Sequence, residues 1–178
     1  MSITVSDYLP GTDFGLPAST LVHRWANIAG TLTCGEHCRI DAFVTITGTV
    51  ELGDRVHIGA GAALFGTEGI KIGSGTSISP GAKIFSASED VRSVRVSNPQ
   101  ALDRAAVRGA VRVGKCSVIG ANAVVLPGVI VGHGSVVAAL TVVPSGRVIE
   151  DHTVVFGQGA RIIVPRELVD TKRALGER

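Results

Sequence analysis

Residues 52–64 read LGDRVHIGAGAAL, and the spacing within this stretch decides the fold. Leu52, Ile58 and Leu64 lie six residues apart, and a small or β-branched residue stands two positions before each of them. Side chains two positions apart in a strand point to the same side. Each hexad is therefore expected to form a short strand with two inward side chains, followed by a turn in which glycine relieves strain.

The same six-residue spacing of apolar residues, which we call the beat, extends over most of the chain. It resumes two residues late after Leu64 and returns once more after a long interruption. The positions on the beat are all apolar: Ile28, Cys34, Ile40, Ile46, Leu52, Ile58, Leu64, Ile72, Ile78, Ile84, Val113, Ile119, Val125, Val131, Val137 and Val143. A repeat of this kind is typical of a parallel β-helix, in which each coil buries its inward side chains against its neighbours. Sixteen hexads at three per coil predict an all-β fold of about five coils.

The composition agrees with a thin, regular core. The chain has 178 residues, enough for one domain, and is 45% hydrophobic but only 4% aromatic. Its charged fraction of 18% and net charge of +2 exclude disorder and give no support for nucleic-acid binding. The N-terminus lacks the features of a signal peptide, and no apolar run is long enough for a membrane span. We therefore expect a cytoplasmic protein.

The beat also divides the chain into segments. We expect an N-terminal cap over residues 1–27 and a β-helix domain over 28–164, from which a polar loop of residues 85–110 is ejected. Pro165 suits the start of a helix, so residues 165–178 are expected to form a short C-terminal helical tail.

The outward position between the two inward ones changes character along the chain. It is mostly polar in the early hexads, whereas the last part has only apolar residues there: Val118, Val124, Ile130, Val136 and Val142. A monomer would not keep such a patch exposed, so self-association is expected, and a three-sided prism makes a homotrimer the simplest closed arrangement. The alternative is that the tail and the loop cover these residues within one chain.

The hexads resemble those of the hexapeptide-repeat acyltransferases, whose fold is a left-handed parallel β-helix. Three stretches are most similar to the sugar acetyltransferases of surface-polysaccharide (O-antigen) biosynthesis: Gly53–Gly66, Ser86–Asp90 with Ser97–Pro99, and Val118–Gly128. The resemblance implies transfer of an acetyl group from acetyl-CoA to a hydroxyl or amine of a sugar or nucleotide-linked sugar. It also implies a trimer that binds the cofactor in a cleft between neighbouring prisms.

The chain departs from some relatives in ways that bear on its chemistry. Galactoside- and maltose-type enzymes carry a His-Pro in the looped region, but residues 85–110 contain no histidine. The five histidines match no three-histidine motif of the γ-class carbonic anhydrases, so we expect no metal. The Gly-x-Pro-Ala-Lys/Arg of the family appears as residues 157–161 without its proline.

His57 is the expected catalytic base. Its side chain should point outward from a strand between two buried neighbours, and imidazole has an unperturbed pKa, about 6.5, that suits proton transfer near neutrality. Glu89 or Asp90 of the loop is expected to orient His57 of the next subunit or to bind a sugar amine. The alternative for His57 is an ordinary surface histidine.

Residues for both substrates follow from the same reasoning. By resemblance, the pantetheine chain of the cofactor should contact Gly120, Ala121, Ala139 and Gly157, and cations beyond the last coil should bind its phosphates: Arg161, Arg166, Lys172 and Arg173. Two outward residues and three loop residues are expected to bind the acceptor: Arg39, Ser77, Arg92, Arg95 and Asn98.

One hypothesis of a different class remains open. A non-catalytic trimeric β-helix scaffold would keep the repeats and the apolar outer positions, but it would need neither the ejected loop nor an outward histidine. Within the enzyme hypothesis, the residues do not decide between O- and N-acetylation or identify the sugar.

Overall fold

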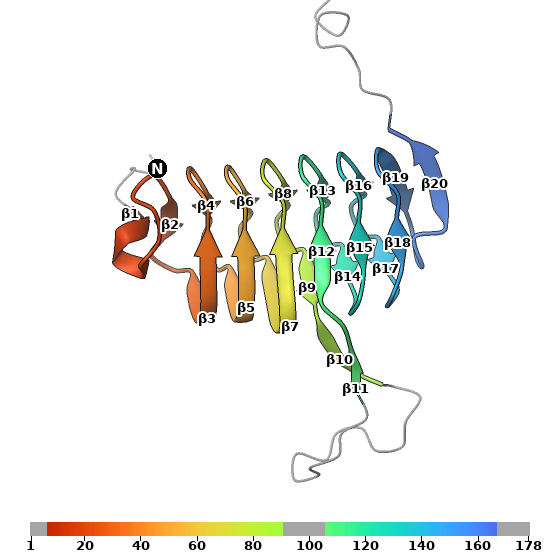
Figure 1. The fold of residues 1–178 in the computed structure, drawn as a ribbon, viewed down its shortest axis with the longest axis horizontal. Coiled ribbons are helices and arrows are strands. Elements are labelled where there is room, and N and C mark those ends of the chain that lie inside the picture. Colours follow the sequence, from red (N-terminus) through yellow and green to blue (C-terminus); the bar gives the residue numbers. More distant parts are fainter. Residues whose placement is uncertain (1–6, 91–105, 167–178) are drawn as a thin grey trace, which may run out of the picture.

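Short strands stack into a column of coils along the whole molecule (Figure 1). The computed structural model describes residues 7–90 and 106–166. Within these ranges, each coil presents one strand segment to each of three faces. We call them the first, second and third faces in the order in which the chain passes through a coil.

The first face contains seven parallel strands among the described residues. They are β2 (Leu21–His23), β4 (Arg39–Ile40), β6 (His57–Ile58), β8 (Ser77–Ile78), β13 (Val118–Ile119), β16 (Val136–Val137) and β19 (Thr153–Phe156). One antiparallel strand closes each end of this face, β1 (Tyr8–Pro10) on β2 and β20 (Ile162–Pro165) on β19.

The other two faces share their first three strands. β3 (Asn27–Cys34), β5 (Thr45–Leu52) and β7 (Ala63–Ile72) each turn from the second face onto the third. The second face continues through β9 (Lys83–Phe85), β14 (Val124–Val125) and β17 (Val142–Val143). The third face continues through β12 (Val111–Val113), β15 (Ile130–Val131) and β18 (Val148–Ile149).

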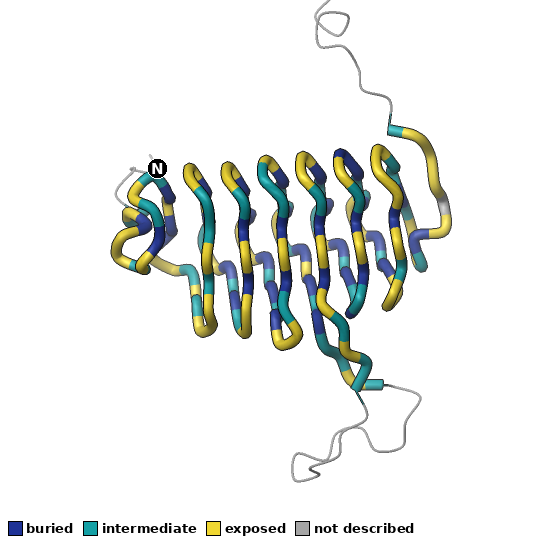
Figure 2. Tube along the Cα trace, viewed as in Figure 1, coloured by how far each residue is buried: buried dark blue, intermediate teal, exposed yellow. Residues whose placement is uncertain are grey.

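The predicted inward side chains form the core, which confirms the parallel β-helix (Figure 2). Fourteen of the sixteen beat positions are no more than 6% exposed, and Ile28 and Cys34 of the first coil are partly buried against them. The column has more strands than the sixteen hexads imply because the six-residue spacing continues beyond them. Val22, Ile149 and Val155 lie six or twelve residues outside the predicted run, and all three are buried.

The interruption leaves the column where expected. β10 (Ala87–Glu89) and β11 (Ala106–Arg108) pair as an antiparallel hairpin that projects from the coils between β9 and β12 (Figure 1). The hairpin therefore departs at the edge between the second and third faces. Arg92, Arg95 and Asn98 lie outside the described residues.

Both ends differ from the expected boundaries. β2 already pairs in parallel with β4, so the coils begin near Leu21 rather than at residue 28, and β1 with the 3₁₀ turn η2 (Gly11–Phe14) forms the cap. Pro165 ends strand β20 and does not start a helix. A run of β-branched residues before it favours a strand, and β19 offers the unpaired edge that β20 covers. Residues 167–178 lie outside the described residues.

Candidate active site

The first face brings three predicted residues into one row. Arg39 of β4 pairs in register with His57 of β6, and His57 pairs with Ser77 of β8. Parallel strands lie about 4.8 Å apart, so these side chains are immediate neighbours. The residues on either side of His57, Val56 and Ile58, are buried, which directs the imidazole outward as predicted.

Asp41 completes this site and was not predicted. Its Oδ2 lies 2.8 Å from Nε2 of His57, while its Oδ1 accepts hydrogen bonds from the Tyr8 hydroxyl at 2.5 Å and from Nε of Arg39 at 2.7 Å. Arg39 also donates to the Tyr8 oxygen at 2.9 Å. Only 14% of the Asp41 side chain is exposed, against 42% for His57. The carboxylate is thus held inside the network, and the imidazole is held at its outer side.

The network keeps Asp41 ionised. Burial alone would raise the pKa of Asp41, but hydrogen bonds from Tyr8, His57 and Arg39 outweigh it and leave the pKa below its ordinary value. Burial and the bond to Asp41 raise the pKa of Tyr8, and the bonds to Tyr8 and Asp41 raise the pKa of Arg39. Both groups therefore remain donors near neutrality. An ionised Asp41 accepts the Nε2 proton of His57, which assigns the lone pair of the neutral imidazole to Nδ1.

The position of Asp41 beside His57 could have been predicted from the sequence. One coil separates Arg39 from His57, and Asp41 stands two positions after Arg39, so its side chain points outward on the same side as Arg39. A carboxylate diagonal to an outward histidine can therefore be found from the repeat. Tyr8 cannot, because its place depends on β1 folding back antiparallel onto β2.

The loop carboxylates do not join His57 within one chain. Glu89 ends β10, and the hairpin leaves the edge between the second and third faces. In a three-sided column this edge is the one opposite the first face, which carries His57. An encounter between Glu89 or Asp90 and His57 therefore requires two copies of the chain.

The predicted pantetheine contacts lie along a single edge. We call the turns between the first and second faces the first edge: residues 41–44, 59–62, 79–82, 120–123 and 138–141. Gly120, Ala121 and Ala139 belong to it, and Gly157 begins the turn that follows β19 in the next coil. Asp41 begins this edge beside His57, so the structure aligns the predicted cofactor residues with the predicted base.

The first edge has backbone N–H groups that lack the acceptors found for the equivalent N–H groups on another edge. In the turns between the third and first faces, which we call the third edge, side chains of the next coil accept from these N–H groups: Asp54 from Glu36, Ser74 from Asp54, His133 from Lys115 and Asp151 from His133. The equivalent residues of the first edge include Ala121 and Ala139. Their N–H groups have no acceptor among the described residues. A row of open donors suits the carbonyl groups of an extended ligand.

The structure places the predicted cationic side chains at different edges of the column. Arg161 precedes β20 near Gly157, at the end of the first edge. Arg166 follows β20 and donates to the carbonyls of Cys116 and Gly134, at 3.2 and 2.7 Å, on the third edge. Because β20 crosses the width of the first face, Arg166 does not share a site with Arg161. Lys172 and Arg173 lie outside the described residues.

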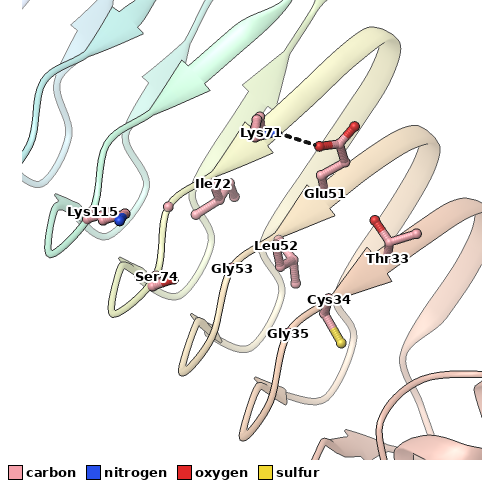
Figure 3. A pocket seen from close by; sticks show the side chains of 11 residues that line it. Thr33, Cys34, Gly35, Glu51, Leu52, Gly53, Lys71, Ile72, Ser74 and Lys115 are labelled. Carbon is pink, nitrogen blue, oxygen red and sulfur yellow. Dashed lines mark hydrogen bonds and ion pairs between the residues drawn. The ribbon is translucent and has the colours of Figure 1, made fainter.

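One hollow of the described surface lies away from His57. A groove of about 410 Å³ runs beside the third face, and its lining includes Lys71, whose Nζ lies 2.9 Å from a carboxylate oxygen of Glu51, as well as Lys115 (Figure 3). Its lining does not include His57. With 42% of its side chain exposed, His57 lies on an open face of the described part of the chain.

No helix within the described residues is long and apolar enough to cross a membrane. No group of three or more histidine, cysteine or acidic side chains within the same ranges is arranged to hold a metal ion.

Comparisons with known proteins give a consistent picture. Residues 32–66 match the model of the bacterial transferase hexapeptide (six repeats), and residues 110–143 match the hexapeptide repeat of succinyl-transferase. The chain is 30% identical over 140 residues to the dTDP-4-amino-4,6-dideoxy-D-glucose acyltransferase of Escherichia coli, covering 76% of this chain and 72% of that protein. It is 32% identical over 147 residues to WbbJ of E. coli K12, a putative lipopolysaccharide biosynthesis O-acetyl transferase, covering 77% and 70%.

Two other similarities show less, because one covers only part of a longer relative and the other shows only a shared fold. The bifunctional protein GlmU of Acidithiobacillus ferrooxidans is 29% identical over 158 residues, which are 81% of this chain but only 34% of GlmU, so the chain spans about a third of that relative. The crystal structure of AntD, an N-acyltransferase from Bacillus cereus in complex with dTDP and 3-hydroxybutyryl-CoA, superposes with a TM-score of 0.80. It is 23% identical, with 96% of this chain and 94% of AntD covered, which shows a shared fold.

Proposed function

The chain belongs to the bacterial hexapeptide-repeat transferases, and on that premise we propose that it is an acetyl-CoA-dependent acetyltransferase. Its acceptor is a hydroxyl or amine of a sugar or nucleotide-linked sugar in surface-polysaccharide biosynthesis. The relatives named for sugar acylation support the acceptor class. The observation that carries the proposal is the His57–Asp41 pair beside an edge of open N–H groups.

The residues of this chain fit an acyl-CoA. Ala121 and Ala139 offer N–H donors that have no acceptor in residues 7–90 and 106–166, and Arg161 supplies a cation near the end of the same edge. When bound, acetyl-CoA supplies an acyl group activated as a thioester. The pantetheine chain would lie along the first edge with its thiol end toward His57.

His57 performs the proton transfers. Nδ1 accepts the proton of the acceptor hydroxyl or neutral amine as the acceptor oxygen or nitrogen bonds to the acyl carbon and the carbon–sulfur bond of the thioester breaks. The same proton then passes to the sulfur of the departing CoA, so the imidazole returns to its neutral form. Asp41 fixes the tautomer and stabilises the imidazolium between these steps, in the way that a buried carboxylate orients a catalytic histidine.

A homotrimer completes the proposed site. The first face is open, and the hairpin with Glu89 and Asp90 projects from the opposite edge, so a neighbouring copy can bring it to His57. Two apolar residues of the third face support contact between copies, since Ile130 and Val148 are 40% and 52% exposed. Of the five predicted outward residues, Ile130 is exposed, and the other four are partly buried: Val118, Val124, Val136 and Val142. We place the protein in the cytoplasm, where acetyl-CoA and nucleotide sugars are made.

Release of CoA from acetyl-CoA tests the proposal. Wild type, His57→Ala and the control His133→Ala are compared with a panel of sugar and nucleotide-sugar acceptors. Acceptor-dependent release should fall by about 10²- to 10⁴-fold in His57→Ala for a hydroxyl acceptor and more mildly for an amine of low pKa. His133 lies on the third edge, and His133→Ala should retain activity. No acceptor-dependent release with any acceptor would favour the scaffold hypothesis.

A further inference from the structure

Two exposed aromatic rings stack at the N-terminal end of the first edge. The ring centroids of Trp25 and Phe43 lie 5.4 Å apart with their planes 25° from parallel, and the residues are 58% and 63% exposed. The carbonyl of Trp25 accepts the Phe43 N–H at 3.1 Å, which ties the two turns together. We call Trp25 and Phe43 the aromatic ledge.

The backbone of Phe43 is not one that favours a phenylalanine. Its φ is +60°, in the left-handed region, where bulky side chains are unusual. The same turn position holds glycine in the next two coils, Gly61 and Gly81, and then Asn122. Phe43 thus adopts a strained conformation while leaving most of its ring in water. Core packing does not account for this ring, which points to a ligand.

The ledge is joined to the candidate active site by successive side-chain contacts. The Arg39 guanidinium lies 5.0 Å from the centroid of the Tyr8 ring, the Tyr8 ring lies edge-on to His23 at 5.1 Å, and His23 lies 5.3 Å from Trp25. Nε and one Nη of Arg39 are engaged by Asp41 and Tyr8. Its other Nη has no acceptor among the described residues, and 54% of the side chain is exposed.

We propose that the aromatic ledge stacks on the base of a nucleoside diphosphate and that the free Nη of Arg39 faces its phosphates. This inference rests on the proposed function and narrows it, because the acceptor is then a nucleotide-linked sugar and not a free one. Aromatic rings stack on any base, and a guanidinium recognises phosphate oxygens. The order ledge, Arg39, His57 along neighbouring coils matches the order base, diphosphate, sugar in such a ligand.

The chain carries its own reporter for this contact. Trp25 is the single tryptophan, so intrinsic fluorescence reports the ledge alone. Titration with UDP, dTDP or GDP should quench the emission saturably, whereas inorganic pyrophosphate should not. Phe43→Gly removes one ring and suits the left-handed turn, so the variant should fold with an unchanged or higher Tm. Its Kd for the quenching nucleotide should rise about 5- to 100-fold.

A matched control exists at the other end of the edge. Leu140 is also bulky, left-handed at φ +60° and 71% exposed, but it lies far from Trp25 in the stack. Leu140→Gly relieves the same strain and should leave the nucleotide Kd unchanged. A Kd that is equal in wild type and Phe43→Gly would overturn the proposal, and dissociation of an oligomer in that variant would then assign the ledge to contact between copies.

The failure of this proposal can be told from the failure of the transferase assignment. Calorimetric binding of acetyl-CoA without quenching by any nucleoside diphosphate up to millimolar concentration overturns the ledge and leaves the transferase. Nucleotide quenching in a chain that binds no acetyl-CoA would support stacking on the aromatic ledge and overturn the transferase assignment.

Discussion

Asp41 holds the imidazole of His57 in place. The carboxylate accepts from three donors, and a single hydrogen bond, 2.8 Å long, connects it to the imidazole. His57 was predictable because a period-two strand with buried neighbours leaves the residue between them outward. Tyr8 was not predictable, because its contact with Asp41 spans 33 residues and follows from the pairing of β1 with β2.

Substitution Asp41→Asn should lower kcat much more than it changes KM. Asparagine keeps the shape but cannot enforce the Nε2–H tautomer or stabilise the imidazolium, so a loss of about 10- to 10⁴-fold is expected. The pH profile of kcat should move as well, because the imidazole loses its negative neighbour. A reduced Tm with unaltered kcat and pH profile would show that Asp41 is only structural.

The lowered pKa of Asp41 makes stability depend on pH in a defined window. A carboxyl whose pKa is lower in the folded state stabilises fully above its unfolded value of about 3.9, and the contribution is lost as the pH falls through the folded pKa. The stability difference between wild type and Asp41→Asn, about 1–3 kcal/mol at pH 5, should shrink as the pH falls below about 4. Urea unfolding at several pH values from 5 downward measures it, and a difference that grows below pH 4 would contradict the network.

At the element scale, the hexad pattern predicted the coils because each strand contributes two inward side chains whose identity the beat reports. The prediction for the start of the tail was wrong, because Pro165 was expected to begin a helix but ends strand β20. There the free edge of β19 decides the conformation, and a sequence pattern does not show which edge is free. The open N–H groups of Ala121 and Ala139 depend likewise on what the neighbouring coil offers, and alanines offer no acceptor.

Ala121→Pro tests these donors one at a time. Pro80 occupies the same turn position in the preceding coil of the first edge, so proline fits the turn while it removes the Ala121 N–H. The Kd of acetyl-CoA, measured by calorimetry, should rise about 2- to 12-fold for one lost hydrogen bond, with an unchanged circular dichroism spectrum. An unaltered Kd in a folded variant would remove Ala121 from the cofactor contacts.

Across the whole molecule, the outward strand positions change from mostly polar in the early coils to apolar in the late coils. The early coils carry Arg39, His57 and the aromatic ledge, and the late coils carry Ile130 and Val148 on the third face. The repeat showed this change directly, since outward positions can be listed from the beat. It did not show that the hairpin and His57 lie on opposite sides, which follows from the order of the three faces.

The double substitution Ile130→Glu/Val148→Glu should convert the proposed trimer into monomers and abolish acyl transfer. Carboxylates would face one another across an apolar contact, and the open first face would lose its neighbour. Light scattering after size exclusion gives the mass. Arg112→Glu is the control, because Arg112 pairs with Ile130 on the same face but is already polar and exposed. An unchanged trimer in the double variant would move the contact to another face.

Calorimetric titration of the wild-type chain with acetyl-CoA is the decisive test of the acyltransferase assignment. Saturable binding with a stoichiometry near one site per chain is expected. No heat of binding up to millimolar acetyl-CoA would contradict the acyltransferase assignment and leave the coils as a scaffold whose partners are proteins.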